Sequence, residues 1–199
     1  MDPITTFRGK SVAIPIANID TDQITPARFL KGTEKKLAHA FFADWRFNAD
    51  GSPKPEFPLN KPGAQGASVL VAGDNYGCGS SREHAPQALM RWGIRAIVGG
   101  SFGEIFFGNC VMLGIPCLRV SQADLEWLQK EISRSPQTTL SVDVEKQEVT
   151  FGDRVIKATV PDGPRNQLVN GQWDSTAVLL EAGDQIEATA KKLPYVSGF

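Results

Sequence analysis

The sequence is poor in histidine and cysteine, the residues that most often hold metal ions. It contains two histidines, His39 and His84, and three cysteines, Cys78, Cys110 and Cys117. No two cysteines have the Cys-x-x-Cys spacing typical of zinc and iron–sulfur sites. We therefore expect no metal site and no cofactor held by this chain alone. The odd, unpatterned set of cysteines indicates reduced thiols, as in a cytoplasmic protein.

Two further absences exclude other classes of protein. The 21 Lys and Arg residues balance 22 Asp and Glu residues, for a net charge of −1, so the chain has no long-range attraction for nucleic acid or an anionic membrane. No apolar run approaches the roughly 20 residues of a membrane span. The start, Met1-Asp2-Pro3-Ile4, has no basic segment followed by an apolar core, so we expect no signal peptide.

The chain nevertheless has ample apolar material for a core. Its 199 residues are 41% hydrophobic, and at about 100–200 residues per domain this predicts a single domain, residues 1–199. Residues 48–66 form a long loop rich in proline and glycine. Loops of this length are usually functional lids, partner contacts or mobile linkers.

The pattern of apolar residues predicts an α/β fold in two parts. The first part alternates short buried strands with helices, which indicates parallel pairing. The second part alternates in the manner of antiparallel strands, followed by helical signals. The expected strands are residues 10–16, 67–72, 94–98, 115–120, 138–144, 148–151 and 155–160; the expected helices include 33–42 from Thr33, one ending before Gly93, 102–113, one from Ser121, 174–181 and 184–192.

Helix caps refine this assignment. Ser101 and Glu104 have capping-box spacing for the helix over residues 102–113, and Ser121 with Asp124 has the same role for the next one. Within the first of these helices we expect Phe106, Phe107 and Met112 to belong to the core rather than to a pocket.

Residues 77–83, Gly-Cys-Gly-Ser-Ser-Arg-Glu, are the most informative stretch. Gly77 and Gly79 allow a positive φ and a close approach to a ligand. Ser80 and Glu83 match a capping box, but Pro86 would then lie inside the helix, at a cost of about 3 kcal/mol or more. A helix that starts near Glu83 keeps the proline in its first turn.

Arg82 gives this helix start a chemical character. A cation near a helix N-terminus is opposed by the helix dipole, by about 0.3–1 kcal/mol. Beside the hydroxyls of Ser80 and Ser81 and free backbone amides, however, it would form a fork-shaped receptor for a carboxylate or phosphate. The alternative is a surface arginine paired with Glu83 or a nearby acid, with the serines only capping. Ser80 stands where a P-loop requires lysine, which argues against nucleotide binding.

A second polar stretch, Asp20-Thr21-Asp22, precedes Pro26. Two acids two residues apart could bind a hard cation or orient an arginine. The alternative is an Asx-turn and helix N-cap. For His84 we expect a structural role rather than that of a general base, because no nearby residue would orient it.

Four segments of the sequence form a recognisable set. They are residues 18–30 (Asn-Ile-Asp-Thr-Asp-Gln-Ile-Thr-Pro-Ala-Arg-Phe-Leu), 76–86 (Tyr-Gly-Cys-Gly-Ser-Ser-Arg-Glu-His-Ala-Pro), 103–109 (Gly-Glu-Ile-Phe-Phe-Gly-Asn) and 44–47 (Asp-Trp-Arg-Phe). Together they resemble the 3-isopropylmalate dehydratase small subunits of the aconitase superfamily. The resemblance implies a single aconitase-type swivelling β/β/α domain. It also implies a large-subunit partner that carries a [4Fe–4S] cluster.

The implied reaction interconverts 2-isopropylmalate and 3-isopropylmalate through the dehydrated maleate, in leucine biosynthesis. By the same resemblance Ser80 would act as the alkoxide base that removes the carbon-bound proton. Ser81 and Arg82 would hold the carboxylates of a small dicarboxylate substrate, and Asp22 would support them. A non-catalytic partner module would have lost this set of residues, and all four are present.

The substrate's side group is the least determined part of the interpretation. We hypothesise that Arg28, Phe29 and Leu30 form a wall for the isopropyl group; the alternative is packing under the helix at 33–42. Residues 171–179 depart from the family's usual Gly-Leu-Asp-x-Ile run. Citramalate, dimethylmalate and homocitrate therefore remain alternative substrates.

Overall fold

The computed structural model describes residues 1–31 and 34–196, and within them the strands close into a barrel. The order around the barrel is β1-β2-β3-β4-β7-β6-β5. The strands are β1 (Thr6–Ile14), β2 (Val69–Ala72), β3 (Ala96–Gly99), β4 (Cys117–Val120), β5 (Thr139–Asp143), β6 (Glu148–Phe151) and β7 (Arg154–Thr159).

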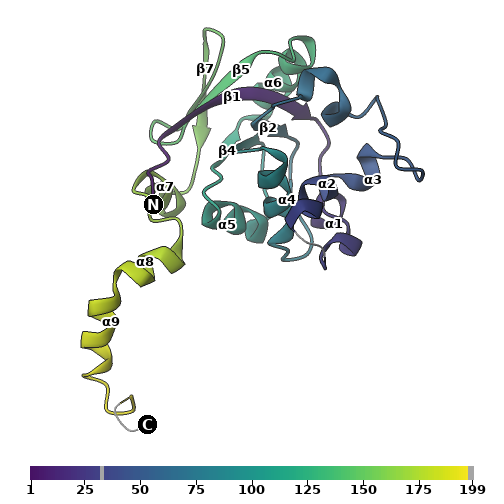
Figure 1. Cartoon of the computed structure of the whole chain (residues 1–199). Helices are drawn as coiled ribbons and strands as arrows, with labels where there is room; N and C mark the ends of the chain where they lie inside the picture. The colour runs from purple at the N-terminus through teal and green to yellow at the C-terminus, as the bar shows by residue number, and fades with distance from the viewer. Residues whose placement is uncertain (32–33, 197–199) are drawn as a thin grey trace.

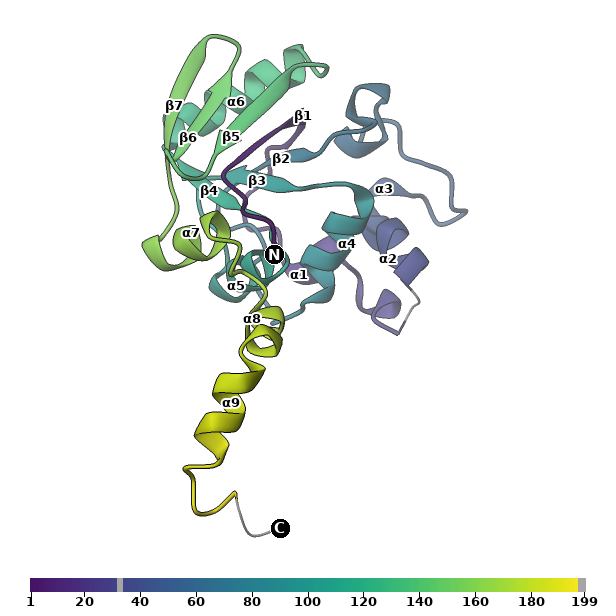
Figure 2. The same cartoon turned by 60° about the vertical axis from the view of Figure 1, so that its left-hand side comes forward.

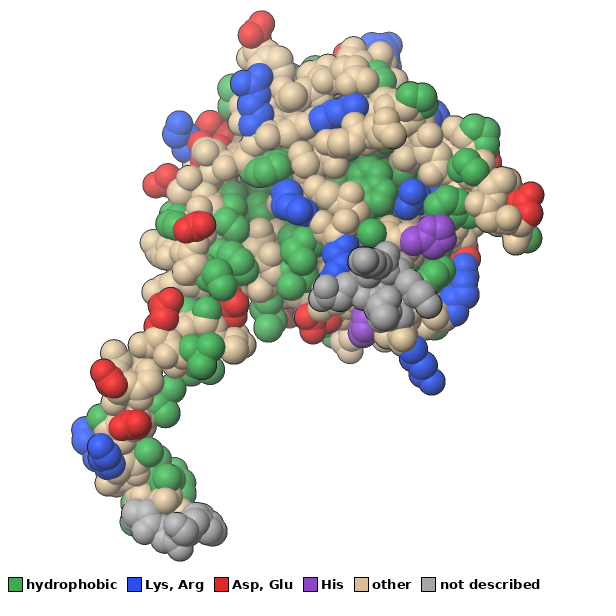
Figure 3. Space-filling model, in the orientation of Figure 1, with side chains coloured by type: hydrophobic (Ala, Val, Ile, Leu, Met, Phe, Trp, Pro, Cys, Tyr) green, Lys and Arg blue, Asp and Glu red, His purple; other side chains and the backbone are tan. Residues whose placement is uncertain are grey.

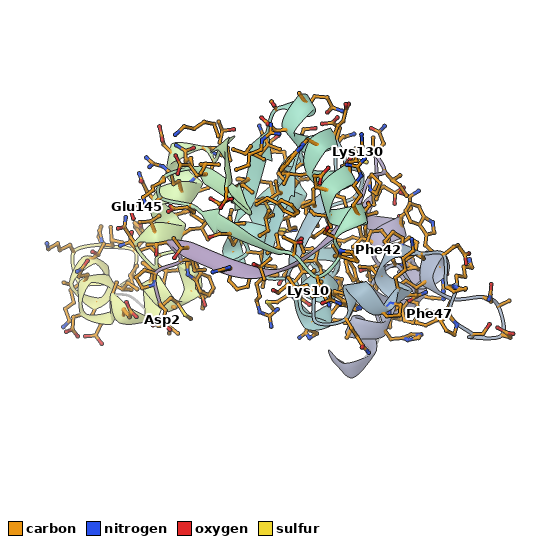
Figure 4. The ribbon with its side chains drawn as sticks, turned by 90° about the horizontal axis from the view of Figure 1, so that it is seen from above. Asp2, Lys10, Phe42, Phe47, Lys130 and Glu145 are labelled. Atoms are coloured by element: carbon orange, nitrogen blue, oxygen red, sulfur yellow. The ribbon has the colours of Figure 1, made fainter. Side chains whose placement is uncertain are left out.

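The barrel has a parallel half and an antiparallel half, as the sequence predicts. Strands β1 to β4 pair in parallel, whereas β4-β7, β7-β6, β6-β5 and β5-β1 are antiparallel. The long strand β1 joins the halves: its first part pairs with β5 up to Lys10, and its second part pairs with β2 from Ser11. Lys10 marks this change of partner midway along the strand (Figure 4).

Helices connect the parallel strands and extend the fold at one end (Figures 1 and 2). Strand β1 is followed by α1 (Thr21–Ile24), η1 (Ala27–Phe29), α2 (Glu34–Ala40) and α3 (Ala43–Arg46). One helix then follows each of β2, β3 and β4, namely α4 (His84–Trp92), α5 (Glu104–Met112) and α6 (Gln122–Arg134). The last helices are α7 (Asp162–Val169), α8 (Ser175–Glu181) and α9 (Gly183–Ala190). Thr33, the expected start of α2, lies outside the described residues. In the part of the chain described, no helix is long and apolar enough to cross a membrane.

One of the two predicted caps is confirmed and the other is wrong. Ser121 accepts a hydrogen bond from the Asp124 amide at the start of α6. Helix α5 instead begins after Gly103, and the hydroxyl of Ser101 accepts from the amide of Asn75, at 2.8 Å. Ser101 therefore supports the neighbouring loop, because a contact distant in the sequence replaces the local one.

The core prediction for α5 is also partly wrong. Phe106 and Phe107 are buried as expected, but 57% of Met112 is exposed. Its position on the helix turns it away from the barrel, onto the same face as the exposed Ile105.

The second part of the loop over residues 48–66, from Phe57 onward, packs against the body of the protein, whereas residues 48–53 are exposed. It contains two short turns, η2 (Pro58–Asn60) and η3 (Pro62–Ala64), and buries Phe57 and Leu59. The side-chain amide of Asn60 donates to the carbonyl oxygens of Arg46 and Lys54, at 2.6 and 2.9 Å. These hydrogen bonds satisfy buried backbone groups and fix the course of the loop.

The buried Tyr76 and Cys110 predict a loss of stability at alkaline pH. Burial raises the pKa of both groups well above their ordinary values of 10.0 and 9.0. The unfolded chain therefore loses these protons at a lower pH than the folded protein. The free energy of unfolding therefore keeps its full value below about pH 9. Above the pKa that each group has in the unfolded chain, this free energy falls by about 1.4 kcal/mol per pH unit for that group.

A Tyr76→Phe variant separates the two groups. The Tyr76 hydroxyl is buried without a hydrogen-bond partner among the described residues, so its removal should raise the free energy of unfolding at pH 7 by about 1 kcal/mol. It should also remove the steeper loss above about pH 10. Urea unfolding between pH 7 and 10.5 measures both effects, and a variant less stable than wild type at pH 7 would contradict this account.

Candidate active site

The two motifs that the sequence singles out lie side by side, joined by a short parallel ladder. Asp20 forms a parallel β-bridge with Cys78. The Gly77 amide donates to the carbonyl oxygen of Ile19 at 2.7 Å, and the Thr21 amide donates to that of Cys78 at 3.0 Å. Segments almost sixty residues apart thus share one backbone framework.

The two acids of the stretch over residues 20–22 take two of the expected roles, helix capping and pairing with an arginine. Asp20 is the N-cap of α1 in a capping box with Gln23, where each residue's side chain accepts from the other's amide at 2.8 Å. Asp22, in the first turn of α1, forms an ion pair with Arg82. Asp20 therefore builds the helix, and Asp22 orients the arginine.

Thr21, between the two acids, is a positioning residue that the sequence analysis missed. Its side chain is buried, and its hydroxyl donates to the carbonyl oxygen of Ser80 at 3.0 Å. The Arg82 amide donates to the same carbonyl oxygen, at 2.9 Å. Two donors therefore fix the backbone of Ser80. The only local signal was the position of Thr21 inside the acidic motif.

Gly77 and Gly103 make room for this loop. Gly77 has φ +74°, and a Cβ there would lie 2.2 Å from the Phe106 ring. A Cβ on Gly103 would lie 2.4 Å from the carbonyl oxygen of Gly77. Because Phe106 is buried in the core and cannot retreat, side chains at these positions would displace the loop.

Helix α4 begins in the register that Pro86 requires. His84 is its first residue, and Glu83 is its N-cap, with no side-chain cap. Among the described residues, the amides of Ser81, Glu83 and His84 donate to no protein acceptor. These free donors at the positive end of a helix favour an anion.

The side chains in front of this helix end are available to a ligand. Ser80 and Ser81 are exposed, and neither hydroxyl forms a hydrogen bond within the described structure. Arg82 is only 22% exposed at its side chain, and one of its terminal nitrogens bonds Asp22. The other edge of the guanidinium keeps its parallel donors, which match a carboxylate.

Arg28 and Phe29 line an open cavity of about 470 Å³ together with His39, Asp44 and Phe47. Residues 80–82 do not line this cavity. Arg28 forms a two-pronged ion pair with Asp44 and lies 4.7 Å from the centre of the Phe29 ring. This pairing raises the pKa of Arg28 and lowers the pKa of Asp44. No hydrogen bond in the described structure links these residues or Leu30 to residues 80–82.

The cysteines make no metal centre in the described part of the chain, where no three His, Cys, Asp or Glu side chains gather. Cys110 and Cys117 are buried, and Cys78, within the loop itself, is half-buried.

Comparison with known proteins identifies the family. Residues 1–123 match the aconitase C-terminal domain. The chain is 44% identical to the 3-isopropylmalate dehydratase small subunit of a strain of Thermus thermophilus, covering 98% of this chain and 97% of the relative. This chain belongs to the 3-isopropylmalate dehydratase small subunits. The small subunit from Brucella anthropi is 45% identical, with 97% and 98% covered.

A solved structure supports the same family. The fold is similar to that of 3-isopropylmalate dehydratase from Methanocaldococcus jannaschii, with a TM-score of 0.66 and 25% identity over 90% of this chain and 99% of the other. The small-subunit family implies a large-subunit partner.

Proposed function

We propose that this chain is the small subunit of a hydro-lyase that interconverts 2-isopropylmalate and 3-isopropylmalate by dehydration and rehydration through 2-isopropylmaleate, in leucine biosynthesis. One observation carries the proposal beyond family membership. Residues 80–82 and Asp22, from two distant motifs, lie together at the start of α4, with two unbonded hydroxyls, free amides and an oriented arginine. That set suits a dicarboxylate with a weakly acidic C–H bond.

We assign Ser80 as the catalytic base. A serine alkoxide is a strong base but a very unfavourable anion in water, so it needs oriented donors and a nearby cation. The free amides of Ser81, Glu83 and His84 at the start of α4, together with the guanidinium of Arg82, would supply these. Thr21 and the Arg82 amide hold the carbonyl oxygen of Ser80, which fixes the backbone from which the hydroxyl extends.

We assign Ser81 and Arg82 to the substrate carboxylates. Asp22 occupies one edge of the Arg82 guanidinium and leaves the other for a carboxylate. The pairing with Asp22 also fixes the plane of the guanidinium, which lowers the entropy lost when the substrate binds. Asp22 is thus a positioning residue.

Because Ser80 and Ser81 are exposed, they need a partner that shields them from water. Electrostatic stabilisation of an alkoxide weakens in high-dielectric water, so this surface must be covered before it works. We propose that the large subunit covers it. A [4Fe–4S] cluster in that subunit would supply the Lewis acid for the departing hydroxyl group.

The segment over residues 28–30 favours an alkylmalate over a tricarboxylate. Arg28 is already neutralised by Asp44, so it offers no free cation for the extra carboxylate of homocitrate. Phe29 and Leu30 are half-buried apolar side chains. We propose that they contact the isopropyl group. Citramalate and dimethylmalate, which also carry alkyl groups, remain the second candidates.

A Leu30→Arg variant tests this wall. If Leu30 contacts the isopropyl group, kcat/KM for 3-isopropylmalate should fall about 10-fold or more, the usual effect of losing an apolar substrate contact. Gln137→Arg, at an exposed loop position distant in the sequence, is the control for the added charge. Unchanged alkylmalate turnover by Leu30→Arg would instead assign Leu30 to packing.

The reaction itself is tested with the two-subunit complex. The chain and its cognate large subunit are co-purified without oxygen and assayed with 2-isopropylmalate, citramalate, dimethylmalate and homocitrate. We expect turnover of isopropylmalate by the complex and none by the isolated small chain. An active isolated chain would refute the shared site. A complex inactive on all four substrates would favour a non-catalytic module.

A further inference from the structure

The C-terminal residues 174–196, here called the arm, project from the body of the protein (Figures 1 and 2). The arm contains α8 and α9, and neither helix has a buried residue. Its exposed large apolar side chains are Val178, Leu179, Leu180, Ile186, Tyr195 and Val196. Leu180 is 78% exposed, so these side chains lack the packing that normally stabilises short helices.

The base of the arm is nevertheless firmly built. The side chain of Asp174 caps α8 by accepting from the amides of Thr176 and Ala177. Trp173 packs against Gly114, and its ring nitrogen donates to the carbonyl oxygen of Asp2 at 3.3 Å. The arm therefore leaves the body at a defined place beside the end of α5.

A second apolar strip, on α5, connects this base to the active-site loop. Ile105, Gly108 and Met112 share one exposed face of the helix. The first turn of α5 follows Gly103, which touches Gly77 of the loop, and the helix ends beside Gly114 and Trp173. Nine helical residues span about 13 Å. Hydrophobic side chains cover this region and continue down the arm (Figure 3).

We propose that the strip on α5 and the arm together form the docking surface for the large subunit, which would receive the arm in an apolar groove. The proposal rests on the proposed function, because the surface begins at the loop that the large subunit must cover. A contiguous exposed apolar surface of this kind marks a protein interface. A second copy of this chain bound through the arm alone would not account for the strip on α5, whose first turn follows Gly103 next to Gly77 of the loop.

The test compares affinity with turnover in the full complex. Leu179→Ser/Leu180→Ser should raise the Kd for the large subunit about 100-fold, and Met112→Ser about 10-fold, because a few side chains that become buried carry most of the binding energy of an interface. Val155→Ser, on β7, is the matched control: Val155 is 56% exposed, close to the 57% of Met112, and the Kd should stay unchanged. Calorimetry under anaerobic conditions measures the Kd.

Turnover separates docking from catalysis. At saturating small subunit, the arm variants should recover kcat to within about twofold of wild type, because the arm supplies no reacting group. Thermal melting should stay unchanged, because the substituted side chains are exposed. Arm variants that bind as tightly as wild type would overturn the proposal, and so would a dimer of the isolated chain that only these variants dissociate. Loss of affinity in a complex that does not turn over isopropylmalate would leave the docking surface standing and remove the proposed function.

Discussion

Replacing Ser80 with alanine is expected to lower kcat of the two-subunit complex for isopropylmalate by about 1,000-fold or more. Alanine retains the loop backbone, since Thr21 and the Arg82 amide bond the Ser80 carbonyl oxygen and not its hydroxyl. It removes only the group that would accept the carbon-bound proton. Binding energy from Arg82 remains, so KM should change much less than kcat.

The measurement is a steady-state assay of the anaerobic complex, together with the Kd for the large subunit. The Kd of Ser80→Ala should match that of wild type, and Ser133→Ala, an exposed serine on α6, should leave both quantities unchanged. A fully active Ser80→Ala complex would sink the assignment of Ser80 as the base. An inactive variant that no longer binds the large subunit would instead give Ser80 a structural role.

Gly77→Ala is expected to destabilise the protein by about 3 kcal/mol or more. An alanine at φ +74° loses about 1–2 kcal/mol in the left-handed region, and its Cβ would lie 2.2 Å from a buried aromatic ring. Overpacking of this kind costs about 1–3 kcal/mol. The loop would also shift three residues before Ser80, so turnover should fall where the variant still folds.

Gly51→Ala is the matched control. Gly51 has φ +82°, and a Cβ there would meet nothing within 4 Å, so only the backbone strain of about 1–2 kcal/mol applies. Urea unfolding of both variants measures the difference, which isolates the clash with Phe106. Equal urea midpoints for Gly77→Ala and Gly51→Ala would show that the added Cβ at position 77 does not clash with the Phe106 ring.

The start of α4 shows how far local chemistry predicts a site. Pro86 alone excluded the register in which Ser80 caps the helix, and the helix does begin after Glu83. From local sequence, an acid partner for Arg82 was only an alternative, with Glu83 as the nearest acid, and the resemblance implied that Asp22 supports the arginine. The observed pairing with Asp22 depends on the bridge between Asp20 and Cys78.

Other local predictions failed where a distant contact replaced a nearby one. Ser101 has the spacing of an N-cap, but its hydroxyl serves the Asn75 amide instead. Met112 belongs to an apolar helix with no marked polar face, so periodicity could not tell which of its side chains would turn outward.

The sequence by itself determined the strands and most helices, the helix register at Pro86, the absence of a Cys-x-x-Cys metal motif and the family, because each depends on nearby residues or on motif identity. Only the tertiary structure decided the closure of the barrel, the pairing of Asp22 with Arg82, the role of Thr21 and the exposed surface on α5 and the arm. These features depend on contacts between segments distant in the sequence. The packing of the whole core, rather than local propensity, determines which of these segments come together.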